Sequence, residues 1–119
     1  MLKRSIISSS NPIKSVKYLY SGLQAERIVE QTITDNVLTL TKDKLQTATM
    51  SNNTTINLPT PLGYTEIHLF FVAQSDLVVT CPSAKWSTTP NLSANKTYEF
   101  IFLYINSTVG WLAYVREFS

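Results

Sequence analysis

The chain has little of what most metalloproteins, nucleotide-binding enzymes and crosslinked secreted proteins depend on. Its 119 residues include one cysteine, one histidine and three glycines. A lone cysteine excludes an intramolecular disulfide, and one histidine without a cysteine pair leaves no zinc site built from the usual ligands. Three glycines supply no glycine-rich phosphate loop. We expect one domain with a modest core, and neither a metal nor a cofactor.

Charged residues are also scarce. They make up 15% of the chain, well below the ~25% of an average globular domain. Serine, threonine and asparagine fill the difference, since apolar residues stay at 44%. A helical bundle needs lysine and glutamate on its surface, so this composition favours β-structure with polar loops.

Long apolar stretches are missing as well. None approaches the ~20 residues of a membrane span. The first residues are basic but lack the apolar stretch of a signal peptide. We therefore expect no membrane partner, and a chain made in a cytoplasm and kept there or assembled into something larger.

The net charge of +2 is concentrated at the N-terminus. The first twenty residues hold four bases, Lys3, Arg4, Lys14 and Lys17, and no acid. Such a segment is either a solvated tail or an arm that docks on an acidic surface. Nucleic acid is not expected as a partner, because the remainder of the chain is slightly acidic and lacks a basic aromatic face.

Strand signals dominate what is present. Residues 97–105 alternate aromatic and aliphatic side chains, and a polar turn separates them from residues 109–115, which predicts a C-terminal hairpin. Residues 65–73 form another strong strand. Shorter strand signals follow polar turns and predict two further hairpins: 28–33 with 37–41, and 45–50 with 54–58, besides a short strand at 77–81.

This spacing of strands and turns predicts an all-β fold, an antiparallel β-sandwich that is jelly-roll-like and carries an extended N-terminal arm. We divide the chain into residues 1–44, a basic anchoring arm with a first hairpin, and residues 45–119, the β-sandwich module. The sequence shows no internal repeat.

Two strands are apolar on both faces. In residues 97–105 and 66–73 both sets of alternate side chains include large apolar residues, whereas the outer face of a lone sandwich is normally polar. With no helix expected to cover them, we predict a homo-oligomer whose copies cover one another. The expected interface residues are Phe70, Tyr98, Phe100, Phe102 and Tyr104.

The candidates for chemistry are few, and we expect no enzyme. His68 lies within a predicted strand, where a packed or interface role is more common than catalysis. Cys81 reads as a small buried hydrophobe. Glu99 is set between aromatic residues and is expected on an outer or interface face, paired with Lys96 or Arg116.

One tryptophan offers a second kind of site. Trp86 follows Lys85 in a predicted loop, residues 82–90. The two residues are either a ligand platform for a sugar ring, or the tryptophan folds back as a lid on the core.

Several segments resemble phage fibre and receptor-binding proteins. They are LQTATMSNNTTINLP at residues 45–59, EIHLFF at 66–71, KWSTTPNLSANKTYEFIF at 85–102 and NSTVGWLA at 106–113. The resemblance spans about residues 39–115 and its motifs are structural. It implies a small β-sandwich at the distal end of a fibre, commonly trimeric. Unlike those proteins, this sequence has no coiled coil or Gly-x-y stalk before the module.

The resemblance implies a virion structural protein, made in the host bacterial cytoplasm. The preferred form is a homotrimeric head fibre or capsid decoration protein, held to capsid or tail proteins by its N-terminal arm. The alternative is a carbohydrate-binding receptor module of a tail tip or baseplate, with a host surface glycan as ligand.

Overall fold

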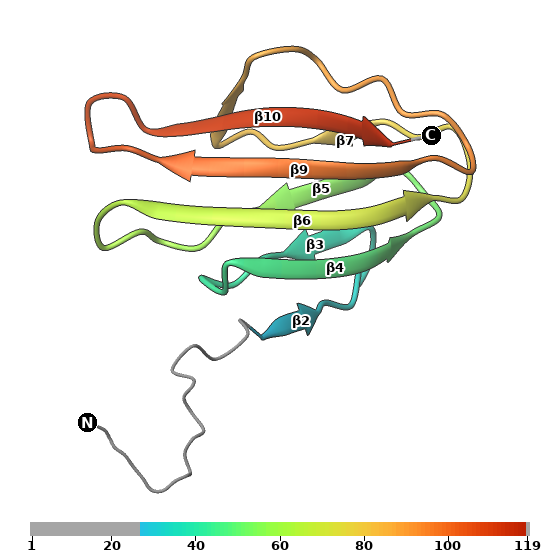
Figure 1. Ribbon diagram of the computed structural model, residues 1–119, viewed down its shortest axis with the longest axis horizontal. Helices are drawn as coiled ribbons and strands as arrows, with labels where there is room; N and C mark the ends of the chain where they lie inside the picture. Colours follow the sequence, from blue (N-terminus) through green and yellow to red (C-terminus); the bar gives the residue numbers. More distant parts are fainter. Residues whose placement is uncertain (1–26, 119) are drawn as a thin grey trace, which may run out of the picture.

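The computed structural model describes residues 27–118, which fold into two facing β-sheets without a helix (Figure 1). The larger sheet has the strand order β2-β4-β6-β9-β10-β8, and the smaller one has the order β3-β5-β7. The all-β prediction is confirmed. The strands are β2 Ile28–Glu30, β3 Val37–Thr39, β4 Leu45–Met50, β5 Thr54–Asn57, β6 Thr65–Ala73, β7 Val79–Thr80, β8 Ala84–Trp86, β9 Thr97–Tyr104 and β10 Trp111–Phe118.

The first six strands wind as a coil. They alternate between the two sheets, so that β2, β4 and β6 pair in parallel in one sheet and β3, β5 and β7 in the other. Each coil adds one strand to each sheet. This is a structural repeat that the sequence hides, because the aligned residues differ in type: Leu45 pairs with Ile28 on one side and with His68 on the other.

The expected antiparallel pairing is therefore wrong for this part of the chain. Both N-terminal hairpin predictions fail, since β2 and β3 lie in different sheets, as do β4 and β5. Their turns are nevertheless real. Asp35 and Asn36 have φ of 53° and 62°, and Thr34 and Val37 exchange two backbone hydrogen bonds, the geometry of a type I′ turn. The turn reverses the chain, but the strands separate into two layers.

Successive turns stack on one another. The backbone N–H of Thr55 donates to the carbonyl of Asn36 at 2.9 Å. The Asn53 side chain accepts from the backbone N–H of Val78, also at 2.9 Å. These bonds satisfy backbone groups that a turn would otherwise leave to water.

The three long strands β6, β9 and β10 pair antiparallel with one another, as predicted. β6 pairs with β9 and β9 with β10 over eight residues each, and the predicted hairpin with its turn is present. Asn106 closes that turn by accepting from the N–H groups of Thr108 and Val109. Gly110 follows with φ of 79°, a conformation that glycine adopts without strain. β8, predicted as a loop, is a short strand parallel to β10.

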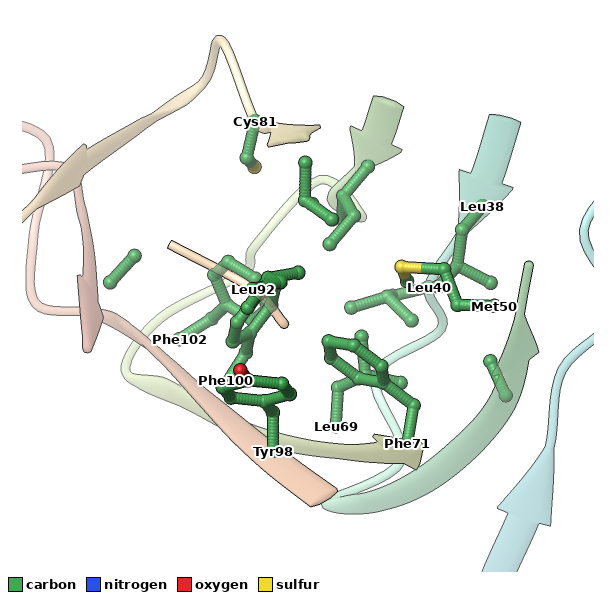
Figure 2. Close-up of a cluster of buried hydrophobic side chains, with 14 of the residues drawn as sticks. Leu38, Leu40, Met50, Leu69, Phe71, Cys81, Leu92, Tyr98, Phe100 and Phe102 are labelled. Atoms are coloured by element: carbon green, nitrogen blue, oxygen red, sulfur yellow. The ribbon is translucent and has the colours of Figure 1, made fainter. Parts of the chain in front are cut away.

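The core lies between the sheets (Figure 2). Aromatic side chains of β6 and β9 point from the larger sheet toward Leu38 and the smaller sheet. Phe100 sits at their centre, with its ring 4.9 Å from that of Phe71 and 6.2 Å from that of Phe102. Edge-to-face pairs of this kind add to the free energy gained by burying the rings.

One polar side chain is fully buried at the edge of this core. The Gln46 amide nitrogen donates to the carbonyls of Thr41 and Asp43 at 2.8 and 2.7 Å. Its amide oxygen accepts from the Gln31 side chain and from the backbone of Thr41. All four hydrogen-bonding positions are filled, so Gln46 fixes the loop that leads from β3 into β4.

The division proposed at residues 44 and 45 falls between two coils of one sandwich. Strands β2 and β3 precede it, and each pairs with a strand that follows it. Residues 1–26, which hold most of the expected arm, lie outside the described part of the chain.

Candidate functional site

The six-stranded sheet has an outer face, formed by the alternate side chains that point away from the core. The strand register places them in rows: Ile28, Leu45, His68, Ile101 and Tyr114 in one, and Glu30, Thr47, Phe70, Glu99 and Arg116 in the next. Rows on either side carry Glu66, Leu103, Leu112 and Lys85, and Thr49, Val72, Thr97 and Phe118. Nine of these eighteen side chains are apolar.

A charge cluster of four side chains is set into the outer face. The Nε2 atom of His68 lies 2.6 Å from a carboxylate oxygen of Glu66, and its Nδ1 atom lies 2.6 Å from one of Glu99. Arg116 donates to the other Glu99 oxygen at 3.3 Å. Three adjacent strands, β6, β9 and β10, supply these groups, and the register sets Glu99 directly opposite Arg116.

A doubly protonated His68 fits the geometry of the two contacts. A neutral imidazole carries one N–H, so one of its nitrogens would turn a lone pair toward a carboxylate. Two contacts of 2.6 Å are instead those of charge-assisted hydrogen bonds from both ring nitrogens. With His68 charged, the two glutamates are balanced by His68 and Arg116, and the cluster has no net charge.

The electrostatic environment agrees with that assignment. Burial lowers the pKa of His68, but the hydrogen bonds to Glu66 and Glu99 raise it by more, so the pKa lies above its ordinary 6.5. The hydrogen bond from His68 lowers the pKa of Glu66; burial opposes this, and the charge of Lys44 adds to it. Both shifts favour the charged forms of their groups.

Glu99 is buried although it points away from the core. Its side chain is only 5% exposed. Phe70 lies beside it in the row, and the Phe70 ring stacks on His68 with centroids 6.4 Å apart. A carboxylate this far from water needs its partners, because an unpaired buried charge is costly.

This arrangement suits ion pairing better than catalysis or metal binding. Both His68 nitrogens are occupied by carboxylates, so neither lone pair is free for a metal or a substrate proton. Among residues 27–118, no group of three or more histidine, cysteine or acidic side chains is placed to hold a metal ion. Cys81 is buried, and burial raises the pKa of its thiol to about 11, which suits its interpretation as a packed hydrophobe.

The predicted interface is wrong for three of its five residues, because they are buried within one chain. Tyr98, Phe100 and Phe102 are at most 1% exposed and lie in the core of a single chain, so they cannot contact another copy. The smaller sheet covers them, which the sequence did not reveal. Tyr104 is half-buried against Trp111. Of the five, Phe70 alone belongs to the outer face.

The predicted ligand platform is a packed element. Trp86 on β8 meets Phe100 and Phe102 edge-on, with ring centroids 5.2 and 5.9 Å apart, as expected for the lid interpretation. Lys85 donates to the carbonyl of Val109 at 2.8 Å. The expected attachment residues, Lys3, Arg4, Lys14 and Lys17, lie outside the described residues.

A polar groove of about 530 Å³ lies at the opposite edge of the larger sheet, beside β2. Turn residues of two successive coils line it, with hydroxyl, amide and carboxylate side chains. Asp35, Asn36 and Asn52 are among them. The sequence marked these residues only as turns, because the stacking of the coils was not predicted.

The sequence also held a partial signal for the charge cluster. Glu66 and His68 share a face of one strand by simple alternation, and Glu99 was expected to pair with Lys96 or Arg116; the structure shows Arg116. The link between the two strands depends on the pairing of β6 with β9, which alternation alone does not give.

The chain matches no protein-family model, no curated protein and no solved structure. Across residues 27–118 there is also no helix of the length and apolar character needed to cross a membrane.

Proposed function

We propose that the protein is a non-enzymatic structural component of a phage virion, and that it works as a homo-oligomer, with a trimer preferred. One observation carries the homo-oligomer: the β-sandwich has a complete internal core, yet the outer face of its larger sheet keeps large apolar side chains exposed, among them Ile28, Val72 and Phe118. A subunit that assembles with copies of itself has this character.

The virion assignment rests on the resemblance of residues 39–115 to phage fibre proteins. Within it we propose a head fibre or capsid decoration protein, with the basic N-terminal segment as the attachment to capsid or tail proteins. Mass spectrometry of purified phage particles tests it. We expect the chain in the particles at a copy number that is a multiple of three, and its absence from them would overturn the assignment.

The arm has its own test. A chain that lacks residues 1–17 keeps the whole described sandwich and should still fold and associate. We expect it to be missing from particles, whereas the full chain is incorporated. Normal incorporation of the shortened chain would overturn the anchoring role.

For the fold, the finer prediction was a jelly-roll-like sandwich with an extended arm. The parallel pairs of the first six strands favour a coiled sandwich that ends in an antiparallel hairpin, and we propose that description in its place. The extended arm stays a prediction.

A carbohydrate-binding receptor module is the second candidate. The polar groove beside β2 favours it, since hydroxyl, amide and carboxylate groups suit a sugar. Trp86 is no longer the residue to test, because its removal would disturb the core. A glycan array with the native chain and with Asn52→Ala separates the candidates: binding lost in the variant supports the receptor role, and no binding by the native chain contradicts it.

A further inference from the structure

We infer that copies of this chain associate through the outer face of the six-stranded sheet, enclosing the charge cluster in its protonated state. The inference deepens the proposed function, since it rests on the homo-oligomer proposed there. The outer face replaces the interface residues that the sequence indicated, most of which are buried. Protonation of the charge cluster is added as a condition for assembly.

The size of the face meets what an interface between copies needs. At roughly 16 Å² of sheet per residue, the strands of the larger sheet present about 600 Å². Two such faces that cover each other completely bury about 1,200 Å², the lower end of the range of specific protein interfaces. The exposed apolar side chains lie on strands from one side of the sheet to the other: Ile28 on β2, Val72 on β6, and Tyr114 and Phe118 on β10.

The charges of the face suit an identical partner. Two copies carry the same charges, so a face with net charge would repel its counterpart. Here Glu66 and Glu99 are balanced within one chain by His68 and Arg116, and the remaining acid and base of the face, Glu30 and Lys85, cancel in number. A partner of opposite charge would find no excess to attract it, whereas a second copy meets a surface without net charge that is half apolar.

The outer face also carries a shallow hollow and protruding side chains. A shallow hollow of about 270 Å³ lies where Thr47 of β4 borders Phe70 and Val72 of β6. Large apolar side chains that fill such hollows contribute most of the binding free energy in many interfaces. Each copy carries both the hollow and exposed rings to fill it, Tyr114 and Phe118.

Enclosure links assembly to protonation. The groups that bear on His68 are Glu66 on its own strand, Glu99 on β9, Arg116 through Glu99, and Lys44 through Glu66. Removal of the His68 proton leaves an unbalanced negative charge, and covering it from water is costly. Association should therefore weaken as pH rises, by about tenfold in the association constant per pH unit for each proton taken up on association.

The test is light scattering on the full chain at pH 6 and pH 9, with two charged substitutions. Phe70→Lys adds a lysine to the centre of the outer face. Val78→Lys is the matched control, because Val78 is 61% exposed and lies just before β7, away from that face. Circular dichroism checks the fold of each variant. If Phe70→Lys does not fold, Thr47→Lys, at a half-buried polar position of the same row, takes its place in the test.

We expect an oligomer for the native chain and for Val78→Lys, a monomer for Phe70→Lys or Thr47→Lys, and weaker association at pH 9 than at pH 6. An oligomer that survives the outer-face substitutions overturns the inference and leaves the proposed homo-oligomer standing. A native chain that is monomeric at every concentration overturns both. Association with the same strength at both pH values overturns the role of the charge cluster.

Discussion

The two faces of the six-stranded sheet are built from the same strands, and both carry large apolar side chains, yet they have different surroundings. Phe71 and Phe100 on the inner face are covered by the smaller sheet, whereas Phe70 and Ile101, one residue along, are only half-buried. The one fully buried polar group of the inner face, Gln46, meets neutral partners. The outer face instead holds a cluster of charges.

The apolar content of a strand therefore does not say which of its two faces is covered within the chain. A residue run with two apolar faces needs two covers. The coil of β3, β5 and β7 supplies one of them within the chain. We propose that another copy of the chain supplies the second, over the face that holds the charge cluster.

The largest expected effect is on the inner face. Phe100→Ala removes a ring with no exposed surface and should lower the free energy of unfolding by about 3–5 kcal/mol. Phe70→Ala on the outer face should cost a dilute monomer less than about 1 kcal/mol. Urea unfolding at low protein concentration measures both. Equal losses in the free energy of unfolding would contradict the distinction between a covered inner face and an uncovered outer face.

A substitution of Gln46 tests how much its buried hydrogen bonds stabilise the edge of the inner face. Gln46→Met keeps the length of the side chain but leaves the carbonyls of Thr41 and Asp43 without their donor. We expect a loss of about 2–3 kcal/mol. Gln74→Met, at an exposed position, is the matched control and should change little. A Gln46→Met protein as stable as the control would contradict the role of this side chain.

The outer face should respond to pH in the opposite sense to a typical acid-labile protein. The pKa of His68 is raised in the folded chain, so the stability that its charged form contributes is complete below 6.5 and is lost as pH rises through the folded pKa. The free energy of unfolding should fall with a slope of at most ~1.4 kcal/mol per pH unit.

Urea titrations at pH 6, 7.5 and 9 measure that slope, with His68→Gln as the control that should flatten it. Stability that rises across this range, or a slope that persists in His68→Gln, would show that another group is responsible.

Local features of the fold were predictable from the sequence, and the arrangement of the layers was not. Alternation and turn residues gave β4, β6 and the C-terminal hairpin with nearly correct bounds. The Asp35–Asn36 turn was predicted too. A tight turn favours pairing of its flanking strands in one sheet, so the sequence predicted hairpins. Parallel contacts between successive coils depend on residues more than fifteen positions apart, and no local pattern reports them.

The candidate site was only partly predictable for the same reason, because it depends on contacts between distant strands. Tyr98, Phe100 and Phe102 were recognised as one face of a strand, but which face the second layer covers is a tertiary fact. The Glu99–Arg116 pair was among the predicted alternatives, because both strands of the hairpin were recognised. Its link to His68 needed the β6–β9 pairing.

The most direct test of the central claim measures the labelling of a cysteine introduced on the outer face, against a native cysteine that should not react. Cys81 is buried, so the native chain should not react with a maleimide while folded. Val72→Cys places a thiol on the outer face, where Val72 is 47% exposed in one chain. If copies cover that face, labelling of Val72→Cys should be rapid in dilute solution and strongly slowed at concentrations where the protein is an oligomer. Labelling at one rate across all concentrations would contradict the account.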